Sequence, residues 1–162
     1  MIILGIDPGV KCCGWAVYQD GSLVRVGLAR GAWWLPTVAD IPQGPAFNIV
    51  AIECPYVYHG AKARPNDIVA LGRVVGACAQ KFRAHTDDLI LVRPMTWKGS
   101  AKKERSHIGI LAKLSQAEAS EIPTKPKGLV HNAIDAVGIA QWAVEYVTAT
   151  RPERGALESR IL

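Results

Sequence analysis

Short apolar runs separated by turn signals dominate the first thirty residues. Residues 1–7 (MIILGID) are rich in β-branched side chains and stop at Asp-Pro-Gly, which predicts a buried strand that meets a turn. Residues 13–18 (CGWAVY) and 23–29 (LVRVGLA) predict two more strands, and Asp20-Gly21 between them is a hairpin signal. We therefore expect a three-stranded antiparallel meander at the start of the chain.

The rest of the chain alternates between helical and extended patterns. Three prolines favour a loop over residues 31–46. After it we expect a fourth strand at 48–53, a helix at 63–85, a fifth strand at 89–92, a helix at 102–114, a Pro/Lys loop at 115–128 and a helix from 130 to 148. This order predicts an α/β domain over residues 1–148, with a mixed five-stranded sheet, helices on both faces and a C-terminal tail at 149–162.

Length and composition narrow the class of protein. The chain has 162 residues, of which 49% are apolar and 20% charged, values that suit one globular domain and exclude a disordered, collagen-like or disulfide-stabilised miniprotein. No window approaches the roughly 18 consecutive apolar residues of a membrane span. Because MIILGID has no basic leader and an early acidic residue, we expect a cytoplasmic protein, in the host cytoplasm if a phage encodes it.

The net charge of +5 is concentrated in one segment. Residues 93–127 carry eight Lys or Arg and three Asp or Glu, so this segment alone has a charge of 8 − 3 = +5 and the remainder is neutral. A basic segment on a neutral body suggests a surface that binds a polyanion such as nucleic acid. The alternative is a solvated helix with an excess of lysines.

Three acidic residues interrupt apolar elements. Asp7 and Glu53 each end an apolar strand, and Asp135 lies within an apolar helix. Each acid also has a structural explanation. Asp7 alone is explained by a turn cap, and Asp135 alone by a surface position or a hydrogen bond in the core. Together, three acids near element ends that converge favour Mg²⁺, which prefers carboxylate oxygens, and two such ions can act in phosphodiester cleavage.

Other catalytic motifs are missing from the sequence. It contains no HExxH pair, no CxxC pair and no GxGxxG or GxxxxGK[ST] loop. Nothing pairs a cysteine nucleophile with a histidine. We expect His59, His85 and His107 to be exposed.

Four segments resemble the RuvC family of Holliday-junction resolvases, within the RNase H-like superfamily. GIDPG with GWAVY resembles the family's opening strand and hairpin, and AIECPYVYHGAKARPNDIVALGRVVGA resembles the stretch from its catalytic Glu into its long helix. VRPMTWKGSAKK is similar to its strand and basic loop, and HNAIDAVGIAQWA to its closing helix. The resemblance covers residues 1–147 and implies an RNase H-like fold.

The resemblance implies an active site of four acids that binds two Mg²⁺ ions. Mn²⁺ is expected to be able to replace Mg²⁺. Asp7, Glu53 and Asp135 take three of the acid positions. The fourth position falls on Asn132, which is neutral, and His131 precedes it. Two alternatives follow: Asn132 acts as a metal ligand, or His131 acts as a ligand or proton carrier. The implied reaction is paired nicking of a four-way DNA junction by a homodimer formed through the helix at 66–84, leaving 5′-phosphate and 3′-hydroxyl ends.

The resemblance also implies DNA-binding residues. Tyr56 matches an aromatic residue that stacks on a base near the crossover, and Tyr58 is the alternative. Basic contacts to the DNA backbone are expected from Lys98, Lys102, Lys103 and Arg105. Two rival functions remain: an RNase H-like nuclease for RNA or other branched DNA, and a non-catalytic dimer that binds junctions.

Overall fold

A computed structural model describes residues 1–30, 40–41, 46–56 and 64–150 of the chain. Most of the predicted loop at 31–46, together with Tyr58, His59 and residues 151–162 of the predicted tail, lies outside the described residues.

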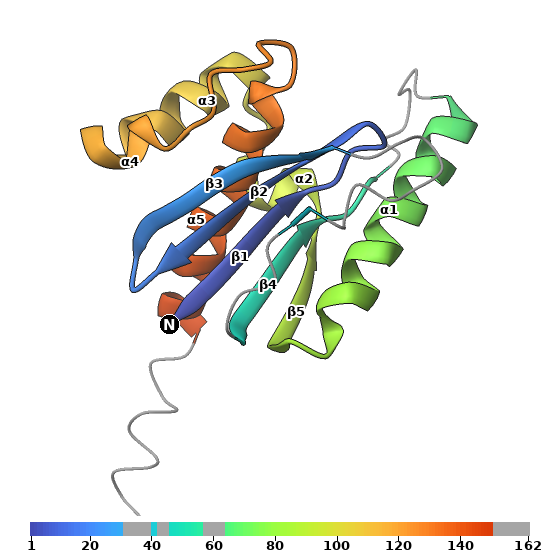
Figure 1. Cartoon of the computed structure of the whole chain (residues 1–162), viewed down its shortest axis with the longest axis horizontal. Helices are drawn as coiled ribbons and strands as arrows, with labels where there is room; N and C mark the ends of the chain where they lie inside the picture. The colour runs from blue at the N-terminus through green and yellow to red at the C-terminus, as the bar shows by residue number, and fades with distance from the viewer. Residues whose placement is uncertain (31–39, 42–45, 57–63, 151–162) are drawn as a thin grey trace, which may run out of the picture.

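Five strands form one mixed sheet in the order β3-β2-β1-β4-β5 (Figure 1). The strands are β1 (Ile2–Asp7), β2 (Cys12–Gln19), β3 (Ser22–Arg30), β4 (Phe47–Glu53) and β5 (Thr86–Val92). The first three pair antiparallel, whereas β4 runs parallel to both β1 and β5. The predicted mixed sheet with its initial meander is confirmed.

The hairpin between β2 and β3 has the predicted turn. Asp20 and Gly21 both adopt positive φ, at 52° and 86°. Two adjacent positive-φ residues are what a two-residue hairpin turn of matching twist requires, and Asp-Gly is among the residue pairs that tolerate them. The register of the meander therefore follows from the local sequence.

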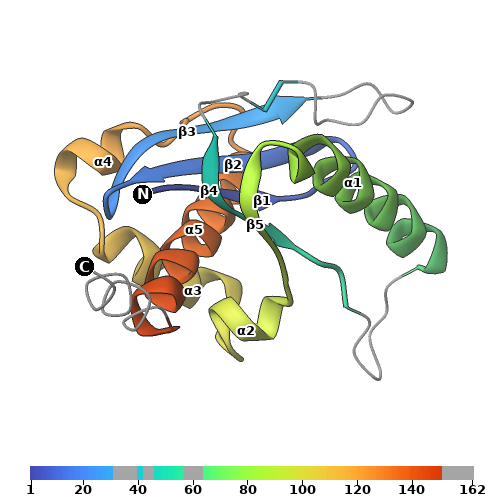
Figure 2. The same ribbon diagram turned by 90° about the horizontal axis from the view of Figure 1, so that it is seen from below.

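The two long helices, α1 (Pro65–Arg83) and α5 (Val130–Thr150), cover opposite faces of the sheet (Figure 2). Successive strand residues point to opposite faces, so Ile3 packs in the core beneath α5 and Leu4 in the core beneath α1. The predicted helices on both faces are confirmed. Among the described residues, no helix combines the length and the apolar character that crossing a membrane requires.

Shorter helices follow β5. They are α2 (Pro94–Lys98), α3 (Lys103–Ala112) and α4 (Gln116–Ser120). The prediction that residues 115–128 form only a loop is wrong, because the first part is α4. The Ser115 hydroxyl accepts a bond from the Glu118 backbone N–H, and the Glu118 carboxylate accepts one from the Ser115 backbone N–H. This capping box begins a helix that the nearby prolines conceal in the pattern.

Two glycines bring α5 down onto the sheet. A Cβ atom at Gly5 would lie 2.5 Å from the Ala136 carbonyl oxygen, and one at Gly14 would lie 1.9 Å from that of Asn132. Any larger residue at either position would therefore push the helix away. This close approach fixes the first turns of α5, which include Asp135, against β1 and β2.

Candidate active site

Asp7 and Glu53 lie at the same end and on the same face of the sheet. Strand register pairs Ile6 with Ile52, so Asp7 and Glu53 each follow the last paired residue. They share the side-chain parity of Ile3 and Ile49, whose side chains pack beneath α5. Both carboxylates therefore belong to the α5 face, at the end where β1 and β4 terminate.

Asp135 approaches this end from α5. It is buried, with 7% of its surface exposed, and is the one buried charged residue in the described part of the chain. His107 Nε2 lies 2.9 Å from its Oδ1, and Lys103 Nζ lies 3.7 Å from its Oδ2. Both partners come from α3, so α3 covers one side of the acid.

Asp7 has the most unfavourable electrostatic position of the three acids. Burial raises its pKa well above the usual value, and the charges of Glu53 and Asp135 raise it further, against a smaller opposing effect of Lys98. Among the described residues, none donates a hydrogen bond to its carboxylate. Glu53 and Asp135 are therefore both close enough to Asp7 for their charges to act on its carboxylate.

Glu53 has two donors. Trp97 Nε1 of α2 donates to Glu53 Oε2 over 2.7 Å, and Lys98 Nζ lies 3.6 Å from the same oxygen. Burial raises the pKa of Glu53, and the Lys98 charge and the Trp97 hydrogen bond oppose that rise. The carboxylate is thus held from one side by α2.

The donor chemistry of this site fits a hard divalent cation. Such ions take carboxylate oxygens, and a partly buried carboxylate without a donor, as at Asp7, is stabilised by a nearby positive charge. In the described part of the chain, however, no three acidic, His or Cys side chains are close enough to enclose one ion. Asp135 and Glu53 are instead turned towards their donors on α3 and α2, so a bound ion would require these side chains to adjust.

Comparison with known proteins was made at the level of sequence and of fold. No protein-family model matches the chain. The crossover junction endodeoxyribonuclease RuvC of Nitratidesulfovibrio vulgaris (strain DP4) is 30% identical over 127 residues, which are 67% of this chain and 74% of the relative. The chain belongs to the RuvC family. Members of this family are metal-dependent nucleases that act at DNA crossovers.

Solved structures agree at the level of fold. The RuvC of Thermus thermophilus, in complex with a Holliday junction substrate, superposes with a TM-score of 0.65 at 21% identity, covering 93% of this chain and 96% of that one. The Holliday junction resolvase of fowlpox virus gives a TM-score of 0.59 at 17% identity, covering 92% and 99%. The RNase H-like fold predicted from the sequence is confirmed.

Asn132, which the sequence resemblance puts at a fourth acid position, has a neutral side chain with a structural contact. Asn132 Nδ2 donates to the Cys12 carbonyl oxygen over 2.9 Å, which ties the first turn of α5 to β2. His131 lies near the acids instead: burial and Lys103 lower its pKa, whereas Asp135 acts to raise it. This geometry favours His131 over Asn132 as the residue that takes part in the RuvC-type chemistry, and both assignments stay predictions.

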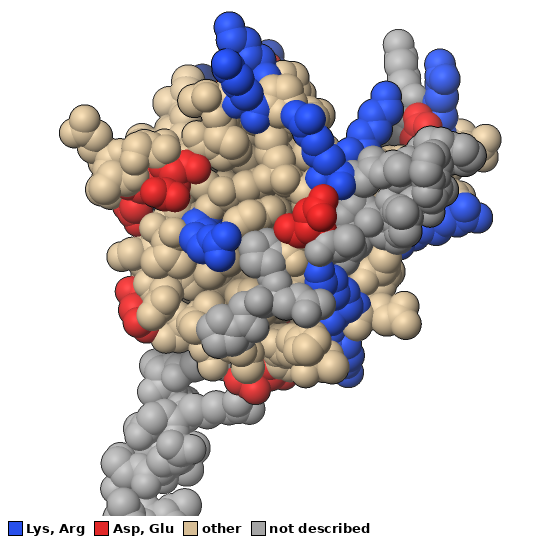
Figure 3. All heavy atoms as spheres, viewed as in Figure 1, with Lys and Arg blue, Asp and Glu red and all other residues tan. Residues whose placement is uncertain are grey.

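The candidate DNA contacts lie around the acids. Lys and Arg side chains gather along the upper margin of the molecule in Figure 3, at the end where β1 and β4 terminate. Lys102, Lys103 and Arg105 are exposed, and Lys98 is half-buried beside Glu53. Tyr56 is exposed, and the Arg93 guanidinium lies over its ring, 4.8 Å from the centroid. Arg93 thus occupies one face of the ring predicted to stack on a base.

Sequence reasoning missed two residues that contact the acids. His107, expected to be exposed, has 16% of its side chain exposed and touches Asp135, so that expectation is wrong; His85 is exposed as expected. His107 follows Lys103 by four residues, a spacing that puts both on one face of α3. Nothing in the sequence pointed to Trp97 as a contact of an acid, apart from its position next to Lys98. Which acid each side chain meets depends on how α2 and α3 pack.

Proposed function

We propose that this protein is a metal-dependent endonuclease that resolves four-way DNA junctions by paired nicks. Its membership in the RuvC family and the convergence of Asp7, Glu53 and Asp135 from β1, β4 and α5 support the proposal. The single observation that carries it is geometric: Asp7 and Glu53 end neighbouring strands on the sheet face that α5 covers, and the first turns of α5, which include Asp135, pack directly on β1 and β2.

Asp7, Glu53 and Asp135 are the residues that would hold the metal, as two Mg²⁺ ions or Mn²⁺ in their place. When bound, such ions would supply an activated water and charge stabilisation at the attacking and leaving oxygens of a phosphodiester, and the expected products carry 5′-phosphate and 3′-hydroxyl ends. Asp7 supplies a carboxylate without a competing donor. Glu53 and Asp135 supply carboxylates that neighbouring side chains orient.

The basic residues bind and orient the DNA backbone. Lys98 and Lys103 reach Glu53 and Asp135 through flexible side chains, and they exchange these carboxylates for phosphates when DNA enters the site. Lys102 and Arg105 add exposed positive charge beside them. Tyr56, and Tyr58 outside the described residues, stack on bases near the crossover.

Two opposed nicks require two active sites, so we include a homodimer through α1 in the proposal. The residues of α1 that face the sheet are Val74, Val75, Cys78 and Phe82. On the exposed side, Val69 is 58% exposed, and no described residue comes within 4 Å of where a Cβ would lie at Gly72 or Gly76. An apolar residue beside two glycines suits close helix-to-helix contact. Val69→Glu should shift the protein to monomer in light scattering, with its circular dichroism unchanged.

A nicking assay tests the function. A synthetic four-way junction with Mg²⁺ should be cut symmetrically in two opposed strands, and Asp7→Asn should abolish cutting while leaving binding intact. Preferential cutting of flaps or RNA hybrids would instead show another RNase H-like nuclease. Binding without cutting would show a non-catalytic junction protein, a possibility that the missing fourth acid and the donor-bound Glu53 and Asp135 keep open.

A further inference from the structure

Trp97 contacts one of the three acids and the helix that carries another. It lies on α2, a single turn that starts at Pro94, directly after the end of β5. Its indole N–H donates to Glu53 Oε2 over 2.7 Å. Its ring is close to Gly138 of α5, which lies three residues after Asp135 and therefore about one helical turn away. One side chain thus contacts both Glu53 and the helix that carries Asp135.

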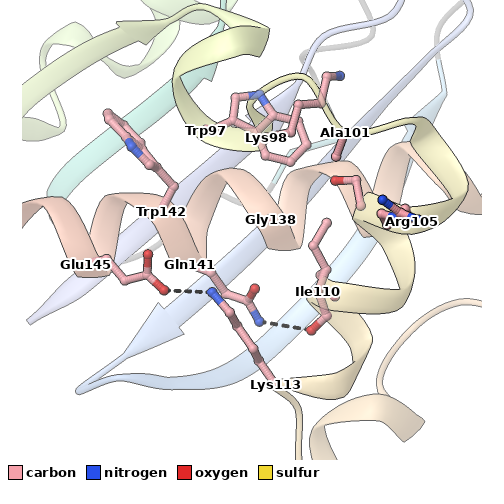
Figure 4. A pocket seen from close by; sticks show the side chains of 12 residues that line it. Trp97, Lys98, Ala101, Arg105, Ile110, Lys113, Gly138, Gln141, Trp142 and Glu145 are labelled. Atoms are coloured by element: carbon pink, nitrogen blue, oxygen red, sulfur yellow. Dashed lines mark hydrogen bonds and ion pairs between the residues drawn. The ribbon is translucent and has the colours of Figure 1, made fainter.

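Gly138 provides the space for this ring. A Cβ at Gly138 would lie 2.6 Å from Trp97 Cζ3 and 2.6 Å from Ile110 Cδ1. Glycine inside a helix is unfavourable by roughly 0.5–1 kcal/mol relative to alanine, so its presence here needs a reason. Figure 4 shows Trp97 and Ile110 from α2 and α3 above and beside the α5 ribbon at Gly138. The absence of a side chain at Gly138 leaves a notch in the surface of α5, and the indole of Trp97 packs into this notch.

We infer that Trp97, packed in the notch at Gly138, is a positioning residue. It holds the Glu53 carboxylate in a fixed orientation relative to α5, the helix that carries Asp135. The inference rests on the proposed metal-dependent function of these acids. It goes beyond that function because Trp97 touches neither metal nor DNA in this role and acts through Glu53.

The other donor to Glu53 cannot hold it in the same way. Lys98 Nζ is 3.6 Å from Oε2 and 4.7 Å from the centroid of the Trp97 ring. Its long side chain is also a proposed phosphate contact, so it leaves Glu53 when DNA binds. Trp97 has two side-chain torsions and is packed against Gly138, so its hydrogen bond persists. An uncharged indole also leaves the negative charge of Glu53 available to a cation.

Two variants separate the hydrogen bond from the notch. Trp97→Phe keeps an aromatic ring and removes the N–H donor, whereas Gly138→Ala closes the notch and leaves Glu53 and the indole N–H unchanged. Loss of an outer partner of a metal ligand typically lowers metal affinity or activity by about 10–100-fold. Trp142→Phe is the matched control, because Trp142 lies one turn further along α5, lines the same pocket and stacks on Tyr146.

Metal binding gives a readout that does not depend on cleavage. We would titrate Mn²⁺ into the DNA-free protein and measure free Mn²⁺ by electron paramagnetic resonance, alongside kcat and KM on a four-way junction. Trp97→Phe and Gly138→Ala should each weaken Mn²⁺ binding at least tenfold and lower kcat with KM unchanged. Trp142→Phe should match the wild type in both, even if all three variants lose similar thermal stability.

Each failure has its own pattern. Wild-type Mn²⁺ affinity and kcat in both Trp97→Phe and Gly138→Ala would overturn the positioning role. An equal loss in Trp142→Phe would also overturn it, because the effect would then reflect general packing. Wild-type protein that binds junctions without cutting them, in Mg²⁺ and in Mn²⁺, would contradict the proposed function instead. If Trp97→Phe does not fold, Gly138→Ala is compared with Ile110→Val, which alters the Ile110 contact alone and should keep wild-type Mn²⁺ affinity and kcat.

Discussion

His107 Nε2 lies 2.9 Å from Asp135 Oδ1, which joins α3 to the one buried acid that the structure describes on α5. Lys103, one turn earlier on α3, reaches the other oxygen of the same carboxylate at 3.7 Å. Asp135 is therefore held at both oxygens by a single helix. Because α3 also belongs to the basic segment, the proposed DNA-binding surface and the orientation of this acid are physically linked.

This link predicts that His107→Ala lowers cleavage about tenfold, because Asp135 loses the partner that fixes its rotamer. His107→Gln should recover part of the rate, since an amide N–H can still donate to Oδ1. Single-turnover rates on a four-way junction measure the effect. His85→Ala, at an exposed histidine before β5, is the control and should cut at the wild-type rate. Equal rates in His107→Ala and His85→Ala would contradict the prediction.

Asp7→Asn should abolish cleavage and stabilise the metal-free protein. The pKa of Asp7 is raised on folding, so folding favours its protonated form and the charged form destabilises the native state as the pH rises through that raised pKa. The gain from Asn is therefore largest at neutral and alkaline pH. It disappears below about pH 4, where aspartate is protonated in the unfolded chain as well.

Thermal melts in EDTA between pH 4 and 8 check this stability effect. Relief of an unfavourable active-site charge typically contributes about 0.5–2 kcal/mol. For a chain of this size, each kcal/mol raises Tm by roughly 2–4 °C. If Asp7→Asn is less stable than the wild type at pH 8, Asp7 is a structural turn cap. It is then not a partly buried acid whose charge destabilises the metal-free protein.

Neutralising exposed positive charge should weaken junction binding in a salt-dependent way. Lys102→Ala with Arg105→Ala removes two exposed cations that contact none of the three acids. The plot of log Kd against log salt should become shallower by up to about 2, because each lost phosphate contact contributes about 0.9. Arg83→Ala, at the end of α1 away from the acids, is the control for net charge. An unchanged slope in the double variant would mean that this part of α3 is only a solvated face.

Alanine variants at His131 and Asn132 should separate catalysis from stability. Asn132→Ala removes the 2.9 Å hydrogen bond to Cys12 and should destabilise the fold by about 1 kcal/mol, with a small effect on cutting. His131→Ala should lower cutting and leave Tm nearly unchanged. Because burial lowers the pKa of His131, loss of wild-type activity through its protonation should occur below the usual pH 6.5 of histidine.

The opposite ranking of the two variants would assign the fourth position to Asn132. In that case Asn132→Asp should also lower the Mg²⁺ concentration needed for cutting. Full activity in both alanine variants would leave a site of three carboxylates.

The order and type of the main elements can be predicted from the sequence, and the sequence also singles out three acids as candidates. Apolar runs such as MIILGID, the Asp20-Gly21 turn and the long apolar helix depend on residues that are close in the chain, and these predictions agree with the structure. Asp7 and Glu53 could be selected because an acid ending a buried strand is unfavourable without a function. The side chains that contact these acids carry no such local signal.

The side chains that contact the acids become visible only in the folded chain. Trp97 and Glu53 are 44 residues apart, and His107 and Asp135 are 28 apart, so these contacts depend on how α2 and α3 pack beside α5. Gly138 makes room for Trp97 of α2 and Ile110 of α3, whereas Gly5 and Gly14 let the α5 backbone approach the sheet. A glycine in the sequence does not show which group will pack against it, because that group comes from a distant part of the chain.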